Sequence, residues 1–194
     1  MPAKKTFNDD QVITQIMQLF WQNGYYHTSM DDIVTKSGVK KQSLYNAFGD
    51  KHTLYLKSLQ RYHQLTLKAC AQAMQPLEQA GESPLTILMM LFSRELVTST
   101  QPTGDLMANA IAEFATTDAA VTQAAEHFYT DYLTLMAAVI LKGQASQTIS
   151  NAQSSMVWAQ SLLEARIGLQ TRIRQGQKPD ITQRQQAWTA LLQV

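Results

Sequence analysis

Apolar residues recur every three or four positions through most of the chain, which is the period of an amphipathic helix. The first such group consists of Val12, Ile16, Leu19 and Phe20. Asn8 precedes it as a candidate N-cap with Gln11 three positions later, and Gly24 follows where a left-handed residue would end the helix. No run of alternating β-branched residues favours a strand. The pattern predicts an all-α protein.

Two short helices are expected next. Ser29 is a candidate N-cap, followed by acidic residues that suit the positive end of a helix dipole. This helix is interrupted at 37–38, where a serine precedes a glycine, and another short helix runs from about Lys41 to Phe48. Residues 49–50, a glycine and an aspartate, end it and cap the helix that follows. The N-terminal region therefore reads as three helices.

Longer helices follow from Lys51 onward. The first is expected to end at Pro76, since proline cannot continue the backbone ladder. Ser83 and Pro84 open a helix that carries Leu85 to Leu96. Further helices fit residues 105–115, 119–142, 151–175 and 181–193, which brings the expected total to nine. We expect a three-helix domain at 1–50 and a larger helical domain at 51–194.

Composition restricts the class of protein. The chain has 194 residues, 45% of them hydrophobic, which is enough for a packed core. A single cysteine excludes an internal disulfide framework, and no Cys/His spacing fits zinc, so we expect no metal and no cofactor. The longest apolar run falls far short of the roughly 18 residues of a membrane span, and the N-terminus has no apolar signal region. These features predict a soluble cytoplasmic protein.

Charge is unevenly distributed although the net charge is only +1. Residues 33–51 contain four lysines and one aspartate. A local basic surface beside a neutral remainder is typical of a confined anion-binding face. Charge alone favours an ordinary solvated helix face instead.

Residues 28–48 form the most informative segment, which reads as helix, tight glycine turn and helix. Gly38 supplies the turn, and apolar residues on either side give the two short helices a shared junction. The second helix of a helix-turn-helix enters the major groove with its N-terminal residues nearest the bases. Here that end carries Lys40, Lys41, Gln42 and Ser43. Glutamine pairs with adenine and lysine donates to guanine. A helical hairpin inside an ordinary bundle is the alternative interpretation.

The chain resembles the tetracycline-repressor (TetR) family of one-component transcriptional regulators over residues 12–62. The matching positions are Leu19-Phe20, Gly24-Tyr25, Thr28-Ser29-Met30, Asp32-Ile33-Val34, Ser37-Gly38-Val39, Ser43-Leu44-Tyr45, Phe48 and Asp50-Lys51 followed by Leu54. The rest agrees in the number, lengths and order of helices. The resemblance implies a homodimer that binds double-stranded operator DNA and releases it when a small molecule binds.

The resemblance also assigns candidate DNA contacts. Thr28 and Lys51 match residues that contact phosphates, and Tyr45 matches a tyrosine that packs against the DNA backbone. The full candidate set is Thr28, Ser29, Lys40, Lys41, Gln42, Ser43, Tyr45, Asn46 and Lys51. Lys40 departs from the family, which often has Ser or Thr there as the cap of the recognition helix. His52 and Thr53 stand where the family often has glutamates.

The C-terminal region is rich in methionine and aromatic residues, most of which must be core. Such residues also suit a small-molecule pocket, and the family's pocket lies in this region. The candidate ligand-binding residues are Met89, Phe92, Met107, Glu113, His127, Phe128, Tyr132 and Trp158. Glu113 and His127 are candidate polar anchors; exposed or structurally paired positions are the alternative. We expect a small apolar or aromatic effector.

The last two helices carry the candidate dimer interface. Ile181, Trp188, Leu191 and Leu192 share a face, and Leu162, Leu169 and Ile173 offer a facing one. Burial of both faces within the chain itself is the alternative.

Two other classes of protein are alternative interpretations of the sequence. One is a helical module whose basic surface binds an acidic partner, and the other is a helical-bundle enzyme using Glu113 and His127. The helix-turn-helix pattern with Tyr45 and Lys51 argues against both, and no catalytic motif supports an enzyme. Within the DNA-binding class, an activator is the alternative to a repressor.

Overall fold

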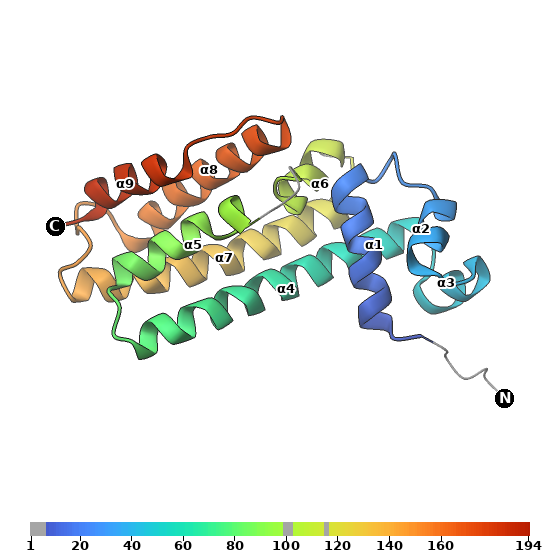
Figure 1. Cartoon of the computed structure of the whole chain (residues 1–194), viewed down its shortest axis with the longest axis horizontal. Coiled ribbons are helices and arrows are strands. Elements are labelled where there is room, and N and C mark those ends of the chain that lie inside the picture. The colour runs from blue at the N-terminus through green and yellow to red at the C-terminus, as the bar shows by residue number, and fades with distance from the viewer. Residues whose placement is uncertain (1–6, 99–102, 115–116) are drawn as a thin grey trace. The chain divides into compact units, whose positions relative to one another are not determined.

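A computed structural model of the chain describes residues 7–98, 103–114 and 117–194 (Figure 1). Within these ranges the structure has nine helices and no strand. They are α1 (Asp9–Asn23), α2 (Met30–Ser37), α3 (Lys41–Phe48), α4 (Lys51–Gln79), α5 (Pro84–Thr98), α6 (Leu106–Phe114), α7 (Ala119–Ala145), α8 (Ser155–Arg174) and α9 (Ile181–Leu192). The predicted all-α class is confirmed. None of the helices in the described ranges has the length and apolar character needed to cross a membrane.

The first helices begin where local capping signals place them. The Asn8 side chain accepts a hydrogen bond from the Gln11 backbone N–H at 3.1 Å, which starts α1. Ser29 and Asp32 form a reciprocal capping box at the start of α2. Gly38 ends α2 in the left-handed conformation, with φ of 67°. These caps satisfy amide groups that a helix end leaves unpaired, and they confirm the predicted starts.

The helices form two compact units. The first contains the described parts of Met1–Leu65 and Leu106–Glu126, and the second contains those of Thr66–Asp105 and His127–Val194. α4 and α7 each contribute residues to both units. The first unit therefore contains α6 and the start of α7 together with the N-terminal helices. The division of the chain into functional domains at 1–50 and 51–194 stays a prediction.

The core of the first unit is strongly aromatic. Phe20 and Tyr55 are at most 1% exposed, and their rings meet edge to face with centroids 5.0 Å apart. Phe114, at the end of α6, stacks on Tyr55 at 5.5 Å. Ile33 and Leu44, which are fully buried, fill the junction of the short helices. Aromatic contacts of Tyr55 thus attach α4 to both α1 and α6.

The second unit is built on α5, α7, α8 and the far part of α4, with α5 packed against both α8 and α9. Phe92 on α5 is fully buried, and its carbonyl accepts a hydrogen bond of 2.7 Å from the buried Arg166 of α8. The Tyr132 hydroxyl of α7 donates to the Leu91 carbonyl at 2.9 Å. These two bonds join three helices through groups that burial would otherwise leave unpaired.

The prediction that Pro76 ends the long fourth helix is wrong, because α4 continues to Gln79. Proline has no backbone N–H, so the Gln72 carbonyl loses its helical hydrogen bond. Both residues are exposed, so water can hydrate that carbonyl. Beyond the proline the ladder resumes, with the Ala80 N–H donating to the Pro76 carbonyl at 3.0 Å.

Two other predicted boundaries are also corrected. α7 passes through Gly143 to Ala145, because this glycine is a close-packing site rather than a helix end; an added Cβ would lie 2.5 Å from the Ile149 side chain. α8 starts at Ser155 rather than 151, since the Ser154 side chain caps it by accepting from the Val157 N–H at 3.3 Å.

Gly24 is required by both its backbone conformation and its surroundings. Its φ of 80° and ψ of 172° lie in a region that is essentially restricted to glycine. A Cβ added there would lie 2.4 Å from the Glu113 carboxylate, which approaches from α6. Gly81 also has a positive φ, of 72°, but nothing lies within 4 Å of its added Cβ.

Gly24→Ala should therefore lower the free energy of unfolding by about 1–3 kcal/mol from backbone strain, with a further loss as Glu113 is displaced. The matched control, Gly81→Ala, should lower the free energy of unfolding by less, because its added Cβ meets no neighbouring atom. Chemical denaturation of both variants measures the difference. Equal losses would show that Glu113 yields without cost.

Candidate nucleic-acid interface

α2, the turn at Gly38 and α3 form a helix-turn-helix with an apolar interior. Ile33, Val39 and Leu44 are at most 8% exposed and fill the junction between the two helices. Their burial orients the opposite side of α3 toward solvent. We call that side the α3 face; its exposed members are Lys40, Lys41, Gln42, Tyr45 and Asn46. The predicted recognition helix is thus exposed along its polar side.

The α3 face carries only weak internal contacts. Lys41 Nζ lies 3.1 Å from the Asp31 carboxylate, with both side chains more than half exposed. Gln42 donates from its side-chain amide to the Asn46 side-chain oxygen at 3.0 Å. Exposed pairs of this kind contribute little to stability, so these groups can exchange their partners for phosphates or base edges.

Lys40 occupies the N-cap position of α3 and makes no side-chain capping bond there. A lysine has no acceptor, so it cannot satisfy the first amide groups of the helix as a hydroxyl would. Its side chain is exposed on the α3 face. Ser43, also in the predicted set, is half-buried, and its backbone N–H donates to the Lys40 carbonyl at 2.9 Å.

Lys51 lies in the first turn of α4, beside Tyr25 of the loop between α1 and α2. Its Nζ is 4.2 Å from the centre of the Tyr25 ring, a cation–π distance. Partial burial lowers the pKa of Lys51, and the negative charges of Glu113 and Asp32 oppose that effect. The structure thus holds a lysine ammonium at a helix N-terminus, where backbone N–H groups also favour anions.

Comparison with known proteins agrees with this geometry. Residues 12–57 match the tetR family of bacterial regulatory proteins. The N-terminal segment is 41% identical over 58 residues to the HTH-type transcriptional repressor ComR of Escherichia coli (strain K12). The N-terminal segment of this chain is thus of the tetR-family type. The ComR match covers 30% of this chain and 28% of ComR, so less than a third of that relative's length.

Two solved structures of transcriptional regulators share the fold across nearly the whole chain. The regulator CifR, solved as a cysteine mutant with a 26-bp double-strand operator DNA, has a TM-score of 0.77 at 18% identity. The match covers 98% of this chain and 99% of that one. FadR from Bacillus subtilis, solved with stearoyl-CoA, has a TM-score of 0.70 at 16% identity and covers 93% and 95%. At these identities the likeness shows the fold.

Two of the candidate DNA contacts instead bond to other groups of their own chain. Thr28 is fully buried, and its hydroxyl donates to the Gly24 carbonyl at 2.7 Å. It therefore has no surface position from which to reach a phosphate. The Ser29 hydroxyl is exposed but bonds to Asp32 in the capping box. Both residues shape the entry to α2.

The two candidate polar anchors for a ligand lie in the settings that were given as the alternative, one structurally paired and one exposed. Glu113 accepts hydrogen bonds from the backbone N–H groups of Tyr25 at 2.8 Å and Tyr26 at 3.5 Å. It thus anchors the loop that leads into the helix-turn-helix. His127 is exposed. Their role as polar anchors of an effector stays a prediction.

The candidate ligand-binding residues are divided between the two compact units. Met107 and Glu113 lie in the first unit, and the other six lie in the second. Phe92, Phe128 and Tyr132 are core residues, at most 3% exposed. Trp158 is half-buried and donates to the Ser150 carbonyl at 3.3 Å. Met89 lines a groove of about 510 Å³ between α5 and α9.

The candidate dimer residues are divided between the interior and the surface. Leu162, Leu169 and Leu192 are buried within their own chain. Trp188 faces Phe92 of α5, with ring centroids 6.4 Å apart. Leu191 is 56% exposed, and Ile173 and Ile181 are half-buried. Much of the predicted apolar face of α9 therefore packs on α5, which was the alternative interpretation.

Sequence reasoning missed the pair formed by His52 and Asp118, whose side chains meet at 2.6 Å. The departure of His52 from the family pattern was visible, but nothing local connects it to a residue 66 positions away. Its partner became evident from the fold.

Lys40→Ser should raise the free energy of unfolding by about 0.5–1 kcal/mol, because serine supplies the missing cap of α3. The same change removes one positive charge from the α3 face. DNA affinity should fall, and the slope of log affinity against log salt should become shallower by about one unit. Denaturation and salt titrations of DNA binding measure the two effects; a stabilised variant with an unchanged salt slope would exclude Lys40 from phosphate contact.

Proposed function

We propose that this protein is a DNA-binding transcriptional repressor that acts in the cytoplasm as a homodimer and leaves its operator when a small molecule binds. The observation that carries the proposal is the α3 face: a recognition helix whose apolar residues are buried and whose exposed side offers lysine, glutamine, asparagine and tyrosine side chains. These are groups that read base edges and contact phosphates.

Different residues of this surface have different tasks in the proposal. Lys41 and Gln42 lie in the first turn of α3, the part of a recognition helix nearest the bases, and they specify sequence. Tyr45 is 40% exposed one turn later and packs against the DNA backbone. Lys51 contacts a phosphate from the N-terminus of α4.

Two copies are needed because successive half-sites on one face of the duplex lie about 34–36 Å apart. The proposed interface uses α8 and α9. Leu191 contributes through its own exposed side chain, together with Met156 and Val157, which are both 42% exposed. The buried Leu162, Leu169 and Leu192 support these helices from inside the chain.

The proposed effector is a small apolar or aromatic molecule that binds within residues 51–194. The B. subtilis FadR structure holds stearoyl-CoA, a ligand with a long apolar chain. α4 is one continuous helix of 29 residues with parts in both compact units, so displacement of one part can move the other. An effector that favours a wrong spacing of the two recognition helices would weaken operator binding.

Selection of bound fragments from genomic DNA by the purified protein tests the function, and an enriched palindromic site is the expected result. Gln42→Ala should then cost about 1–3 kcal/mol and relax the preference at one position of that site. Lys51→Ala should weaken binding to all sequences and reduce the salt slope by about one unit.

Lys142→Ala is the matched control for charge, since Lys142 lies on α7 in the second unit and pairs with Glu78. It should leave both the preference and the salt slope unchanged. A protein that enriches no sequence would contradict the proposed function. Equal, sequence-independent losses in the Gln42 and Lys51 variants would contradict the division of tasks.

Effector action has a reciprocal test. A coupling of about 1–3 kcal/mol weakens operator binding roughly 5–150-fold, and operator DNA must weaken effector binding by the same factor. Calorimetric titration of an effector found by operator release, with and without DNA, measures both factors. An effector whose affinity is indifferent to operator DNA would contradict release by coupling.

A further inference from the structure

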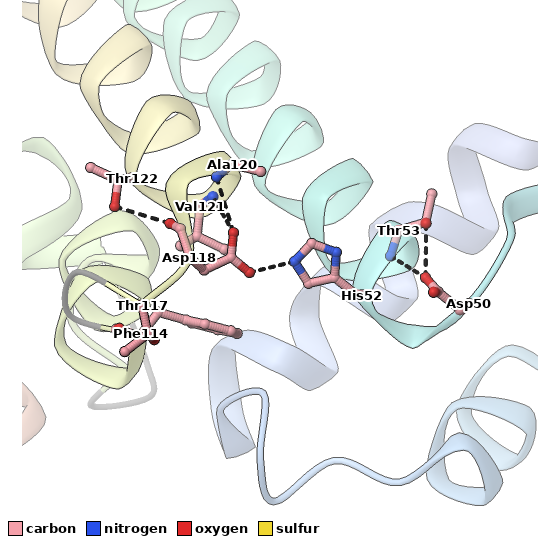
Figure 2. A network of polar contacts seen from close by, with 9 residues as sticks. All are labelled: Asp50, His52, Thr53, Phe114, Thr117, Asp118, Ala120, Val121 and Thr122. Carbon is pink, nitrogen blue, oxygen red and sulfur yellow. Dashed lines mark hydrogen bonds and ion pairs between the residues drawn. The ribbon is translucent and has the colours of Figure 1, made fainter.

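The first turn of α4 is joined to the start of α7 by a close pair of side chains, shown in Figure 2. His52 Nε2 lies 2.6 Å from Asp118 Oδ2. The His52 side chain is 36% exposed and that of Asp118 is 18% exposed, so solvent screens the pair only in part. Both residues lie in the first compact unit.

Asp118 bonds both to His52 and to the start of α7. Its other oxygen, Oδ1, accepts hydrogen bonds from the backbone N–H groups of Ala120 at 3.0 Å and Val121 at 3.1 Å, capping α7 (Figure 2). Burial works against ionisation of this carboxyl, but the bonds from Val121 and His52 outweigh it and keep the pKa of Asp118 below its ordinary value. The carboxylate is therefore a fixed negative charge that faces His52 throughout the neutral pH range.

This pair lies next to the proposed phosphate contact. Lys51 immediately precedes His52 in the chain, and its ammonium lies over the Tyr25 ring. Tyr25 is held by Glu113 through its backbone N–H, and the start of α4 is held by Asp118. Glu113 of α6 thus holds Tyr25, and Asp118 at the start of α7 holds the helical turn that carries Lys51.

Other charged and titratable groups surround the His52 ring. Asp50, which caps α4 through Thr53, adds a negative charge two residues before His52, and bonds from Thr53 lower the pKa of Asp50. The Tyr25 ring meets the His52 ring edge-on with centroids 6.4 Å apart. Histidine is the side chain that ordinarily changes charge between about pH 5 and pH 8.

We propose that His52 and Asp118 are positioning residues that make DNA affinity depend on pH, with the protonated imidazole holding the start of α4, and Lys51 with it, where it binds phosphate. This inference rests on the proposed DNA-binding function. A protonated imidazole and a carboxylate attract each other as opposite charges; loss of the proton removes that attraction and leaves only a hydrogen bond with one charged partner, so the pair weakens without losing the contact. DNA affinity should accordingly fall as the pH rises.

The test compares operator affinity at about pH 6 and about pH 8 for the full-length protein on its selected site. The wild type should bind roughly two- to fivefold more tightly at the lower pH, the range that a partly exposed ion pair supports. His52→Gln keeps a donor but does not titrate, so this part of the pH dependence should vanish. Asp118→Asn keeps a good cap for α7 while removing the charge, and it should flatten the profile equally.

Two further variants separate positioning from general effects of pH or stability. His52→Lys keeps a positive charge at both pH values, so it should bind equally well at both and more tightly at about pH 8 than His52→Gln. His63→Gln, three helical turns further along α4, should retain the wild-type profile. Thermal unfolding at each pH confirms that the variants are folded.

The outcomes distinguish this inference from the function on which it rests. If no DNA site is bound at either pH, the proposed function fails. If the site is bound but His52→Gln retains the wild-type dependence on pH, the function stands and the positioning role is wrong. A wild type whose affinity is constant across this range would also overturn the inference.

Discussion

The loop between α1 and α2 depends on the carboxylate of Glu113. Two successive backbone N–H groups, those of Tyr25 and Tyr26, point to that one side chain on α6. Hydrogen bonds to a charged acceptor are worth about 1.5–3 kcal/mol, more than those between neutral groups. The carboxylate approaches so closely that a side chain at position 24 would displace it. The entry to the helix-turn-helix is therefore fixed by a helix remote in sequence.

The same part of the fold determines which groups reach DNA in the proposed complex. The Tyr25 ring, whose backbone Glu113 holds, supports the Lys51 ammonium, and Asp118 holds the first turn of α4 through His52. The α3 face stays free of strong internal contacts and can exchange them for base edges and phosphates. A fixed contact to the DNA phosphates beside adaptable contacts to the bases suits a protein that must find one sequence among many.

The sequence allowed prediction of features whose signals are local. Caps such as Asn8 with Gln11 and Ser29 with Asp32 act over three residues, and the helix-turn-helix follows from one glycine and a short apolar junction. The Glu113 and His52 contacts span 88 and 66 residues, so only the folded chain brings them together. On α9, Leu191 and Leu192 are consecutive and point in different directions, and periodicity alone did not identify which of them is buried.

Amide hydrogen exchange at Tyr25 and Tyr26 tests most directly whether Glu113 fixes this loop. In the wild type the Tyr25 amide should be protected, since its N–H is bonded to the carboxylate at 2.8 Å. Glu113→Ala should speed its exchange by roughly tenfold or more, the equivalent of about 1.4 kcal/mol. Glu126→Ala, which removes an exposed carboxylate from the same unit, should leave it unchanged. Equal protection of Tyr25 in the wild type and in Glu113→Ala would contradict the account.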